Sequence, residues 1–496
     1  MSASSFDRWP WMAALDDGLR ARLQQAIEQS PAEWDAVLAR SDVAESLERV
    51  WKASEFVEKL CSRQPSLLLE LATHEDLTRP TPAGWIEADL GRRPMGNTEP
   101  EWMDALRRFR KRHMLRIAWR DLAGWSDLDE TLADLSMLAE TCIRFACQRM
   151  TELLGERYGA PRAESDGQVQ SLLTLGMGKL GGHELNFSSD IDLVLLYPEA
   201  GQTDGARPID NAEFFLRLGQ KMVHLLAATT AEGFVYRVDL RLRPFGDSGP
   251  LAVSFAAFEA YLQEHGRDWE RYAYVKARAI TGEAHYRTLY GDVLRPFVYR
   301  RYLDFGVFES LRDMKAMIAR EVERRDLQDN VKLGPGGIRE IEFIVQAFQL
   351  IRGGRDRRLR GRELRSVLPL LAGQRLLRAS SVAELHLAYR FLRVVENRLQ
   401  EWNDEQTHQL PVEAAARLRL AVSMDCDSWE EFIQQLDLHR TRVSGHFAQT
   451  MFGPVADASV AAASRAFDIE GPAEECERTL RESGFAEPVP MQKALD

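Results

Sequence analysis

One segment, residues 171–197, constrains the fold more than any other part of this chain. It reads SLLTLGMGKLGGHELNFSSDIDLVLLY, an apolar run that enters a glycine-rich turn, followed by a second apolar run. This texture predicts two short strands joined by a tight connection. The second strand opens with Asp190 and Asp192, so carboxylates lie where a strand meets a loop. We therefore expect an α/β portion here, placed between stretches that look helical.

The glycine turn imitates two known nucleotide-binding loops, and both are excluded. A literal GxGxxG at Gly176, Gly178 and Gly181 is typical of dinucleotide-binding folds. That fold needs a crossover of a dozen or more residues, including a helix, between parallel strands, whereas only residues 182–189 are available here. A Walker A loop is excluded because Leu173 stands where its first glycine should be.

The spacing of the two aspartates favours metal chemistry. Residues two apart in a strand point to one face, so Asp190 and Asp192 can share one or two divalent cations. The segment Tyr236–Arg243 alternates strictly, with Tyr236, Val238, Leu240 and Leu242 on one face. Its other face carries Asp239, the expected third carboxylate, with arginines on either side of it.

Three carboxylates on one face suit an in-line displacement at phosphorus. Carboxylates are the hard oxygen ligands that Mg²⁺ or Mn²⁺ prefers, and two such ions can bridge the attacking and leaving oxygens. An isolated DxD is common and usually marks a solvated strand end. The glycine turn, the strand-like flanks and the separate arginine-rich strand together favour a metal-dependent nucleotidyl transfer.

Composition limits the class of protein and its partners. The chain has 496 residues, enough for two to four domains, and a formal net charge of −12, which argues against a nucleic-acid-binding protein. Its five cysteines form no CxxC pair, so neither a disulfide framework nor a zinc site is indicated. No secretory signal or apolar run long enough for a bilayer is visible, so we expect no membrane and a cytoplasmic location.

Periodicity predicts a mostly helical α+β protein in four parts. Apolar residues recur at three- and four-residue spacing before the α/β segment and again from Ser254 onward. Between them, Asp210 is expected to cap a helix that ends at Gly233 and backs the sheet. The expected parts are an N-terminal helical region (1–160), an α/β core (161–300), a C-terminal helical bundle (301–452), and a linker with the start of a truncated following region (453–496).

Several blocks of the sequence closely resemble one enzyme family. These are GMGKLGGHELNFSSDIDLVLLYPE, VDLRLRPFGDSGPL, WERYAYVKAR and KLGPGGIREIEFIVQAFQL, which together span most of residues 171–350. They are similar to the bifunctional glutamine synthetase adenylyltransferase/adenylyl-removing enzymes, within the polymerase β-like nucleotidyltransferase superfamily. That family carries two nucleotidyltransferase halves, and the single DxD block here resembles the first half, which removes adenylyl groups.

The resemblance implies a reaction and its participants. Phosphate would attack the α-phosphorus of an adenylyl-tyrosine on adenylylated glutamine synthetase, giving ADP and the free tyrosine. Forward transfer of the AMP moiety from ATP stays open, because it would use the same metal site. A third interpretation is a non-catalytic regulatory module that binds a PII-type nitrogen signal protein, a partner that the family likeness implies.

The resemblance also assigns roles by position. Asp190, Asp192 and Asp239 would hold the ions, while the turn Gly178–Gly182 with Ser189 would approach the phosphates. Lys179, Arg241 and Arg243 are candidate phosphate partners, although a solvated lysine and a surface ladder of arginines are open alternatives. The remaining candidates are the glycines within the turn and a polar stripe on the helix after Gly337: Gly178, Gly181, Gly182, Arg339, Glu342, Gln346 and Gln349.

Two features keep open alternatives at this point. The polar stripe has three open interpretations: an active-site wall, a buried polar network or a solvated helix face. The basic loop GGRDRRLRGR, residues 353–362, has two open interpretations: a docking site for an acidic partner or a nucleotide, or a solvated loop.

Overall fold

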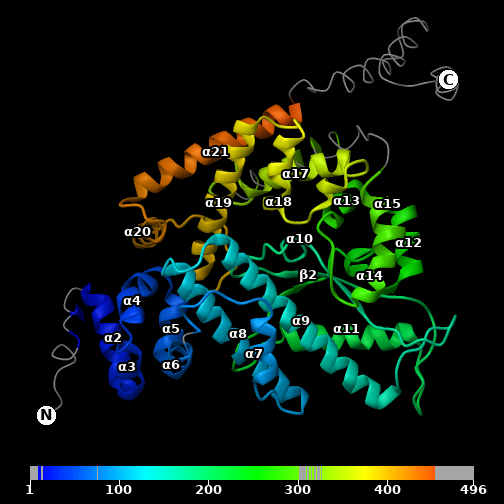
Figure 1. Cartoon of the computed structure of the whole chain (residues 1–496), viewed down its shortest axis with the longest axis horizontal. Helices are drawn as coiled ribbons and strands as arrows, with labels where there is room; N and C mark the ends of the chain where they lie inside the picture. Colours follow the sequence, from blue (N-terminus) through cyan, green and yellow to red (C-terminus); the bar gives the residue numbers. More distant parts are fainter. Residues whose placement is uncertain are drawn as a thin grey trace, which may run out of the picture.

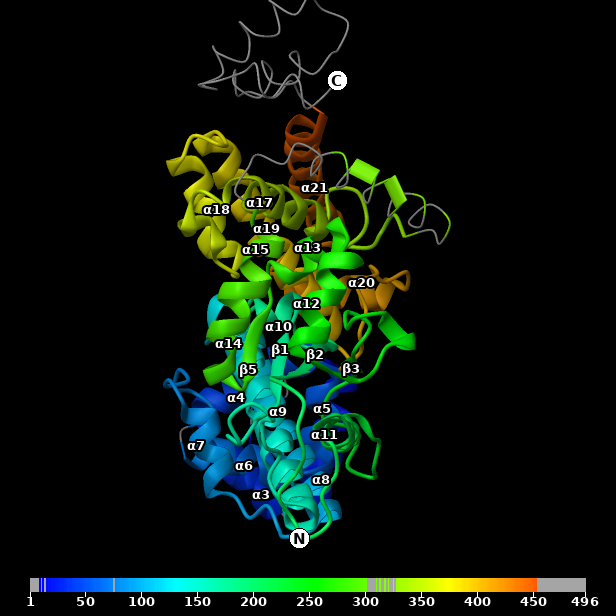
Figure 2. The same cartoon turned by 90° about the vertical axis from the view of Figure 1, so that its right-hand side faces the viewer.

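The computed structural model of this chain is mostly helical and holds one small mixed sheet. It describes residues 9, 11–12, 15–74, 76–300, 309, 312–313, 316–317, 320, 324 and 327–452. The expected linker and truncated region, 453–496, lie outside the described residues. Two sets of helices, N-terminal and C-terminal, lie on opposite sides of the sheet (Figures 1 and 2).

The N-terminal set comprises short helices packed against two long ones. The long helix α8 begins with a capping box in which Thr98 and Glu101 satisfy each other's backbone amides. The following helix, α9, is capped by Asp127, whose side chain accepts from the amide of Glu130 at 2.9 Å. The helices are α2 (Asp17–Gln29), α3 (Pro31–Leu38), α4 (Ser41–Ala53), α5 (Glu55–Arg63), α6 (Pro65–Thr73), α7 (Trp85–Arg92), α8 (Glu99–Leu122) and α9 (Leu128–Tyr158).

The sheet has five strands, and β2 pairs with three of the others, β1, β3 and β4. Its order is β3-β2-β1-β5, and β4 also pairs with β2. The strands are β1 (Leu173–Gly176), β2 (Ile191–Tyr197), β3 (Val238–Asp239), β4 (Ala252–Ser254) and β5 (Arg278–Thr281). β1 and β2 are antiparallel, which confirms that no parallel crossover follows the glycine turn. β3 and β4 run parallel to β2 at its beginning and its end.

Strand β2 separates two hydrophobic cores. Ile191, Leu193 and Leu195 point into the core formed with the N-terminal helices, whereas Val194 and Leu196 point into the core formed with the C-terminal helices. This alternation is the period of two that a strand imposes on its side chains. Because Asp192 has the same parity as Val194, its carboxylate lies on the side of the C-terminal helices.

Two elements near the sheet differ from the sequence expectation. The helix after Asp210, α11 (Asn211–Ala227), backs the sheet as expected but ends at Ala227, before Gly233. The carbonyl of Leu226 instead accepts the amides of Val235 and Tyr236, so the chain turns earlier. Strand β3 is only two residues long, and Leu242 packs into the C-terminal core rather than with Val238 and Leu240.

Short helices connect the sheet to the C-terminal set. The strand β5 lies among them, and the periodicity of the sequence did not predict it. The connecting elements are α10 (Gly178–Gly181), a 3-10 turn (Gly246–Ser248), α12 (Phe255–Glu264), α13 (Asp268–Tyr274), α14 (Glu283–Leu289), a π-helical turn (Tyr290–Leu294) and α15 (Arg295–Val298). The C-terminal set is α17 (Ile338–Arg352), a 3-10 turn η4 (Arg357–Arg360), α18 (Leu364–Gly373), α19 (Ala379–Glu401), α20 (Ala414–Ser423) and α21 (Trp429–Phe452).

No helix within the described ranges is both long and apolar enough to cross a bilayer. The expected division at residues 160 and 300 stays a prediction. Helix α9 ends at Tyr158, β1 begins at Leu173, and the second division falls just after α15.

Candidate active site

The predicted carboxylates lie together at one end of β2. Asp192 and Asp239 are direct neighbours in the parallel pairing of β2 with β3, so both side chains leave the same face of the sheet. Asp190, two residues before Asp192, shares that parity. This face is the one opposed by the C-terminal helices, and all three aspartates are partly buried.

The glycine turn brings backbone directly beneath Asp192. Gly178 has φ +52°, and a Cβ at this position would lie 2.9 Å from Oδ2 of Asp192. The amide of Met177 donates to the carbonyl of Asp192 at 2.9 Å, which fixes the turn against the strand. Only glycine fits Gly178 in both conformation and space.

The second half of the turn is packed against backbone. A Cβ at Gly181 would collide with the carbonyl oxygen of Lys276, and one at Gly182 would lie 3.2 Å from the carbonyl oxygen of Arg362. These glycines therefore have packing roles in this state. Their predicted approach to phosphate stays a prediction.

The electrostatics of the site favour a cation. Burial, and then the charges of Asp239 and Asp190, raise the pKa of Asp192 to about 6, while Lys332 and Arg241 oppose the rise. Carboxylates that repel one another in a partly buried site are stabilised when a divalent ion binds between them. The donor set consists of hard oxygens, which fits Mg²⁺ or Mn²⁺.

Two of the three carboxylates are engaged by arginines. Asp190 accepts from Nε of Arg237 at 2.7 Å, and Asp239 accepts both the backbone amide and the guanidinium of Arg241. In the described part of the chain, no three His, Cys, Asp or Glu side chains are arranged to hold an ion as they stand. Asp190 and Asp239 would therefore have to exchange an arginine for the ion.

The structure holds Lys179 and Ser189 in a buried polar cluster. The Nζ of Lys179 lies 2.5 Å from Oε1 of Glu396 on α19 and 2.7 Å from Oδ1 of Asn186. Burial lowers the pKa of Lys179 well below its ordinary value, against the attraction of Glu396. Ser189 donates to the same Asn186 oxygen at 2.6 Å. In this state Lys179 links the loop before β2 to α19, and Ser189 is bonded within that loop.

The two candidate arginines after β3 differ in side-chain exposure and in hydrogen bonding. The side chain of Arg241 is 73% exposed and, among the described residues, its guanidinium is bonded to Asp239 alone, so it can turn toward a ligand. Arg243 donates to the carbonyls of Leu240 and Gly249 and is 11% exposed. Arg243 therefore holds its own loop together.

The polar stripe on α17 is a buried network. Glu342 lies 3.4 Å from Nζ of Lys276 and 3.5 Å from Arg339, and these cations hold the pKa of Glu342 at about 2 against the opposing effect of burial. Gln346 donates to the carbonyl of Tyr272 at 3.1 Å, and Gln349 bonds the loop after α17. The solvated interpretation is wrong for Glu342, Gln346 and Gln349, because all three are at least 95% buried.

Sequence reasoning missed Lys332, which stands at the start of a quoted block. Burial lowers the pKa of Lys332, and Arg339 acts in the same direction, while Glu396, Glu342 and Asp192 oppose them. In the described part of the chain its ammonium forms no ion pair within 4 Å, unlike Lys179 and Lys276. The signal was a lysine immediately before the turn LGPGG, which opens α17.

Two family models match this chain in adjacent regions. The model described as glutamate-ammonia ligase adenylyltransferase matches residues 44–290, which include most of α4, the helices α5 to α9, the sheet and the three aspartates. The model described as GlnD PII-uridylyltransferase matches residues 312–451. The matches meet near the segment between α15 and α17.

Curated relatives match nearly the whole chain. A bifunctional glutamine synthetase adenylyltransferase/adenylyl-removing enzyme of Thioalkalivibrio sulfidiphilus is 49% identical over 469 residues, 93% of this chain and 47% of the relative. Proteins of the same name from Nitrosococcus oceani and Pseudomonas aeruginosa are 50% and 45% identical over 88% and 98% of this chain. The chain spans about half the length of these relatives.

Proposed function

Because this chain belongs to the family of bifunctional glutamine synthetase adenylyltransferase/adenylyl-removing enzymes, we propose that it removes AMP from adenylylated glutamine synthetase. The observation that carries this proposal is the in-register pair Asp192 and Asp239, on a sheet face where Lys332 and Arg339 lie within electrostatic reach of Asp192. The wording of the DxD block, and its place after a helical region, support adenylyl removal as the direction.

The proposed step is a phosphorolysis. An oxygen of inorganic phosphate attacks the α-phosphorus of the adenylyl-tyrosine, and the bond from phosphorus to the tyrosine oxygen breaks. The tyrosine oxygen leaves with the electron pair and takes up a proton, so the products are ADP and restored glutamine synthetase. No oxidant or further co-reactant is needed.

The residues of this chain would bind charge and orient the reacting groups. Asp190, Asp192 and Asp239 would hold two ions, Mg²⁺ or Mn²⁺, which supply charge neutralisation at the phosphate oxygens. The exposed guanidinium of Arg241 is suited to the incoming phosphate, since it can leave Asp239 when an ion binds there. Lys332 and Arg339 would add positive charge on the opposite wall.

A direct assay tests this function. The chain is incubated with adenylylated glutamine synthetase, phosphate and Mg²⁺ or Mn²⁺, and ADP is measured. We expect ADP to form, and the Asp192→Asn variant to lose on the order of 1,000-fold in rate, because a shared ion loses a ligand. The matched control is Asp247→Asn, a change at an exposed carboxylate in the segment after β3. A fully active Asp192→Asn variant would refute the metal assignment.

Forward transfer is the second candidate, because the relatives are named for both activities. In that case ATP and unmodified glutamine synthetase would yield pyrophosphate, and no ADP would appear from the adenylylated form. Running both assays on one preparation distinguishes the directions.

A PII-type signal protein is the proposed regulatory partner. The match of residues 312–451 to a model described as GlnD PII-uridylyltransferase supports docking on the C-terminal helices. If the chain were only a binding module, it would bind such a protein and neither assay would give product.

A further inference from the structure

A cavity of about 750 Å³ lies between α15 and the loop that follows α17. Its size falls within the range of small-molecule sites, roughly 300–1,000 Å³. None of the three aspartates lines it. The lining residues are Arg295, Pro296, Tyr299, Arg300, Gly354, Arg355, Arg357 and Arg360.

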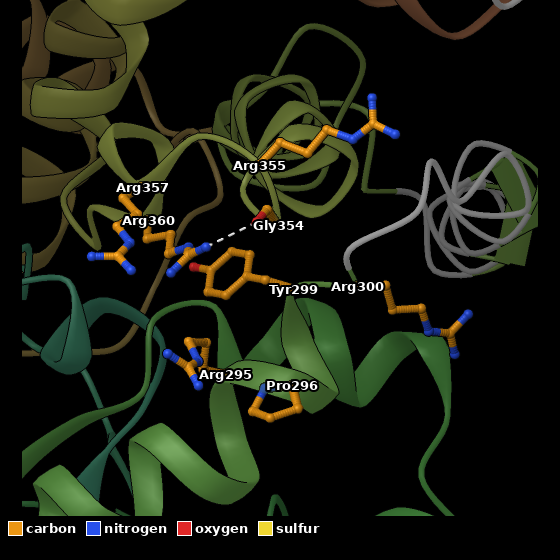
Figure 3. Close-up of a pocket in the computed structure, with 8 residues that line it drawn as sticks. All are labelled: Arg295, Pro296, Tyr299, Arg300, Gly354, Arg355, Arg357 and Arg360. Atoms are coloured by element: carbon orange, nitrogen blue, oxygen red, sulfur yellow. Dashed lines mark hydrogen bonds between the residues drawn. The ribbon is translucent and has the colours of Figure 1, made fainter. Parts of the chain in front are cut away.

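Three of the arginines gather around one aromatic ring. Figure 3 shows Arg295, Arg357 and Arg360 on the same side as the ring of Tyr299, whereas the guanidinium groups of Arg300 and Arg355 point away. Arg360 is fixed there, because it donates to the carbonyls of Gly353 at 2.5 Å and Gly354 at 3.0 Å. Its guanidinium also lies 5.5 Å from the centre of the Tyr299 ring.

The charges in this cavity are not balanced by its own walls. No acidic residue is among the lining residues. The one acid in the loop, Asp356, is held by Arg358, which donates to both of its carboxylate oxygens. Within the described ranges, the side chains of Arg295 and Arg357 form neither a hydrogen bond nor an ion pair. Clustered guanidinium groups repel one another, so a bound anion would stabilise this arrangement.

The loop that follows α17 is held in place by hydrogen bonds within the protein. Gln349 of α17 donates to the carbonyls of Leu359 at 2.8 Å and Gly361 at 2.6 Å. Arg362 continues the attachment by donating to the carbonyl of Ala277 at 2.7 Å. Such preorganisation lowers the cost of ordering a site when it binds.

We propose that this arginine cavity binds a small compound carrying two or more phosphate groups. The planar guanidinium donates two parallel hydrogen bonds, which match a phosphate group better than they match a point acceptor. Three guanidinium groups around one cavity call for several anionic groups on one ligand. The volume of the cavity suits a compound of nucleotide size better than it suits a protein surface. This site would be additional to the aspartate site and does not depend on the proposed function.

The test is calorimetric titration of the full chain with inorganic tripolyphosphate, at constant ionic strength and with EDTA present. Without divalent ions the aspartate site repels phosphate, so binding reports on the arginines. We expect binding to weaken at least 10-fold in the Arg295→Gln/Arg357→Gln double variant. Arg287→Gln, a change at an exposed arginine of α14 outside the cavity, is the matched control and should retain the affinity.

Several outcomes would overturn the proposal. These are the absence of tripolyphosphate binding, an unchanged affinity in the double variant, or an equal loss in the control. Binding of an octaglutamate peptide without tripolyphosphate binding would assign the cavity to an acidic protein segment instead. If the double variant fails to fold, Arg357→Gln alone decides, because Arg357 is exposed and is bonded to no described side chain.

Discussion

Charge is buried on both sides of the sheet, but the partners differ. On the N-terminal side, α8 carries Arg107, Arg112, Arg116 and Arg120, all at least 98% buried. On the C-terminal side, three lysines are buried or partly buried: Lys179, Lys276 and Lys332. Arg107, Arg116 and Arg120 donate to backbone carbonyls of neighbouring segments, whereas Arg112 pairs with Glu70, Asp76 and Asp89. The lysines lie near carboxylates.

Arg107 and Arg116 of α8 donate hydrogen bonds to backbone carbonyls in the loops beside it. Arg107 donates to the carbonyls of Gly233, Leu225 and Ala228, where α11 ends. Arg116 donates to the carbonyls of Asp76 and Arg79, which belong to the irregular segment between α6 and α7. A guanidinium with five donors can satisfy several carbonyls at once, so these residues have architectural roles.

The lysines on the other side are matched to acids, with one exception. Lys276 lies 3.2 Å from Glu184 and 3.4 Å from Glu342, and Lys179 is paired with Glu396. Among the described residues, Lys332 has no such close partner, and it lies within electrostatic reach of Asp192. The comparison teaches that buried cations bound to carbonyls or carboxylates have structural roles, whereas Lys332 has neither partner within the described residues and is left available to a ligand.

The largest expected effect tests the architectural side. Replacing Arg107 with methionine leaves the carbonyls at the end of α11 unpaired, so the free energy of unfolding should fall by about 3 kcal/mol. Urea unfolding measures this change. The exposed neighbour Arg108→Met is the control and should change stability little. Loss of activity in folded Arg107→Met protein would contradict the division between the two sides.

A smaller effect is expected for Lys332→Met, and on activity rather than stability. Removing a positive group that faces the reacting phosphates should lower the rate about 100-fold. The free energy of unfolding should not fall, because no close ion pair is broken. Lys332→Arg should recover part of the rate, and Lys59→Met on the surface is the control. A destabilised variant with normal activity would place Lys332 with the architectural cations.

The smallest effect concerns pH and the N-terminal side. Burial lowers the pKa of His113 to about 4, although its partner Asp89 acts to raise it, and Arg112 and Arg116 act to lower it further. The unfolded state takes up a proton near pH 6.5 and the folded state near 4, so the stability contributed by neutral His113 is full above 6.5. It is lost as pH falls toward 4.

This loss should reach about 2 kcal/mol between pH 7.5 and pH 5. The measurement is urea unfolding at both pH values for the wild type and for His113→Gln, and the difference between their pH dependences gives the contribution of His113. His74→Gln, a change at an exposed histidine, is the control. An identical pH dependence in wild type and His113→Gln would show that the ring is not buried neutral.

The sequence predicted features that depend on local pattern. The strands around the glycine turn, the shared face of Asp190 and Asp192, the helix after Asp210 and the helix after Gly337 all follow from spacing over a few residues. Asp239 was placed correctly on the aspartate side, although its strand is only two residues long. Apolar and polar residues alternate from Tyr236 to Arg243, beyond the two residues of β3 that pair with β2.

Features that depend on distant partners could not be predicted. Lys179 pairs with Glu396, 217 residues away, and periodicity carries no information about such a contact. The arginines of α8 have the composition of a solvated face, and only the loops packed over them bury them. Strand β5 has four residues between helices, too short for alternation to be distinguished from a loop.

The double role of β2 has a consequence for how this chain tolerates change. A slip of one residue in the pairing of β2 would exchange Leu193 and Val194 between the two cores. The same slip would carry Asp192 away from α17 and place an aliphatic side chain beside Asp239. Insertions in the segment before the strand therefore cannot be absorbed by sliding it, so the apolar side chains that stabilise the protein also fix where its acid points.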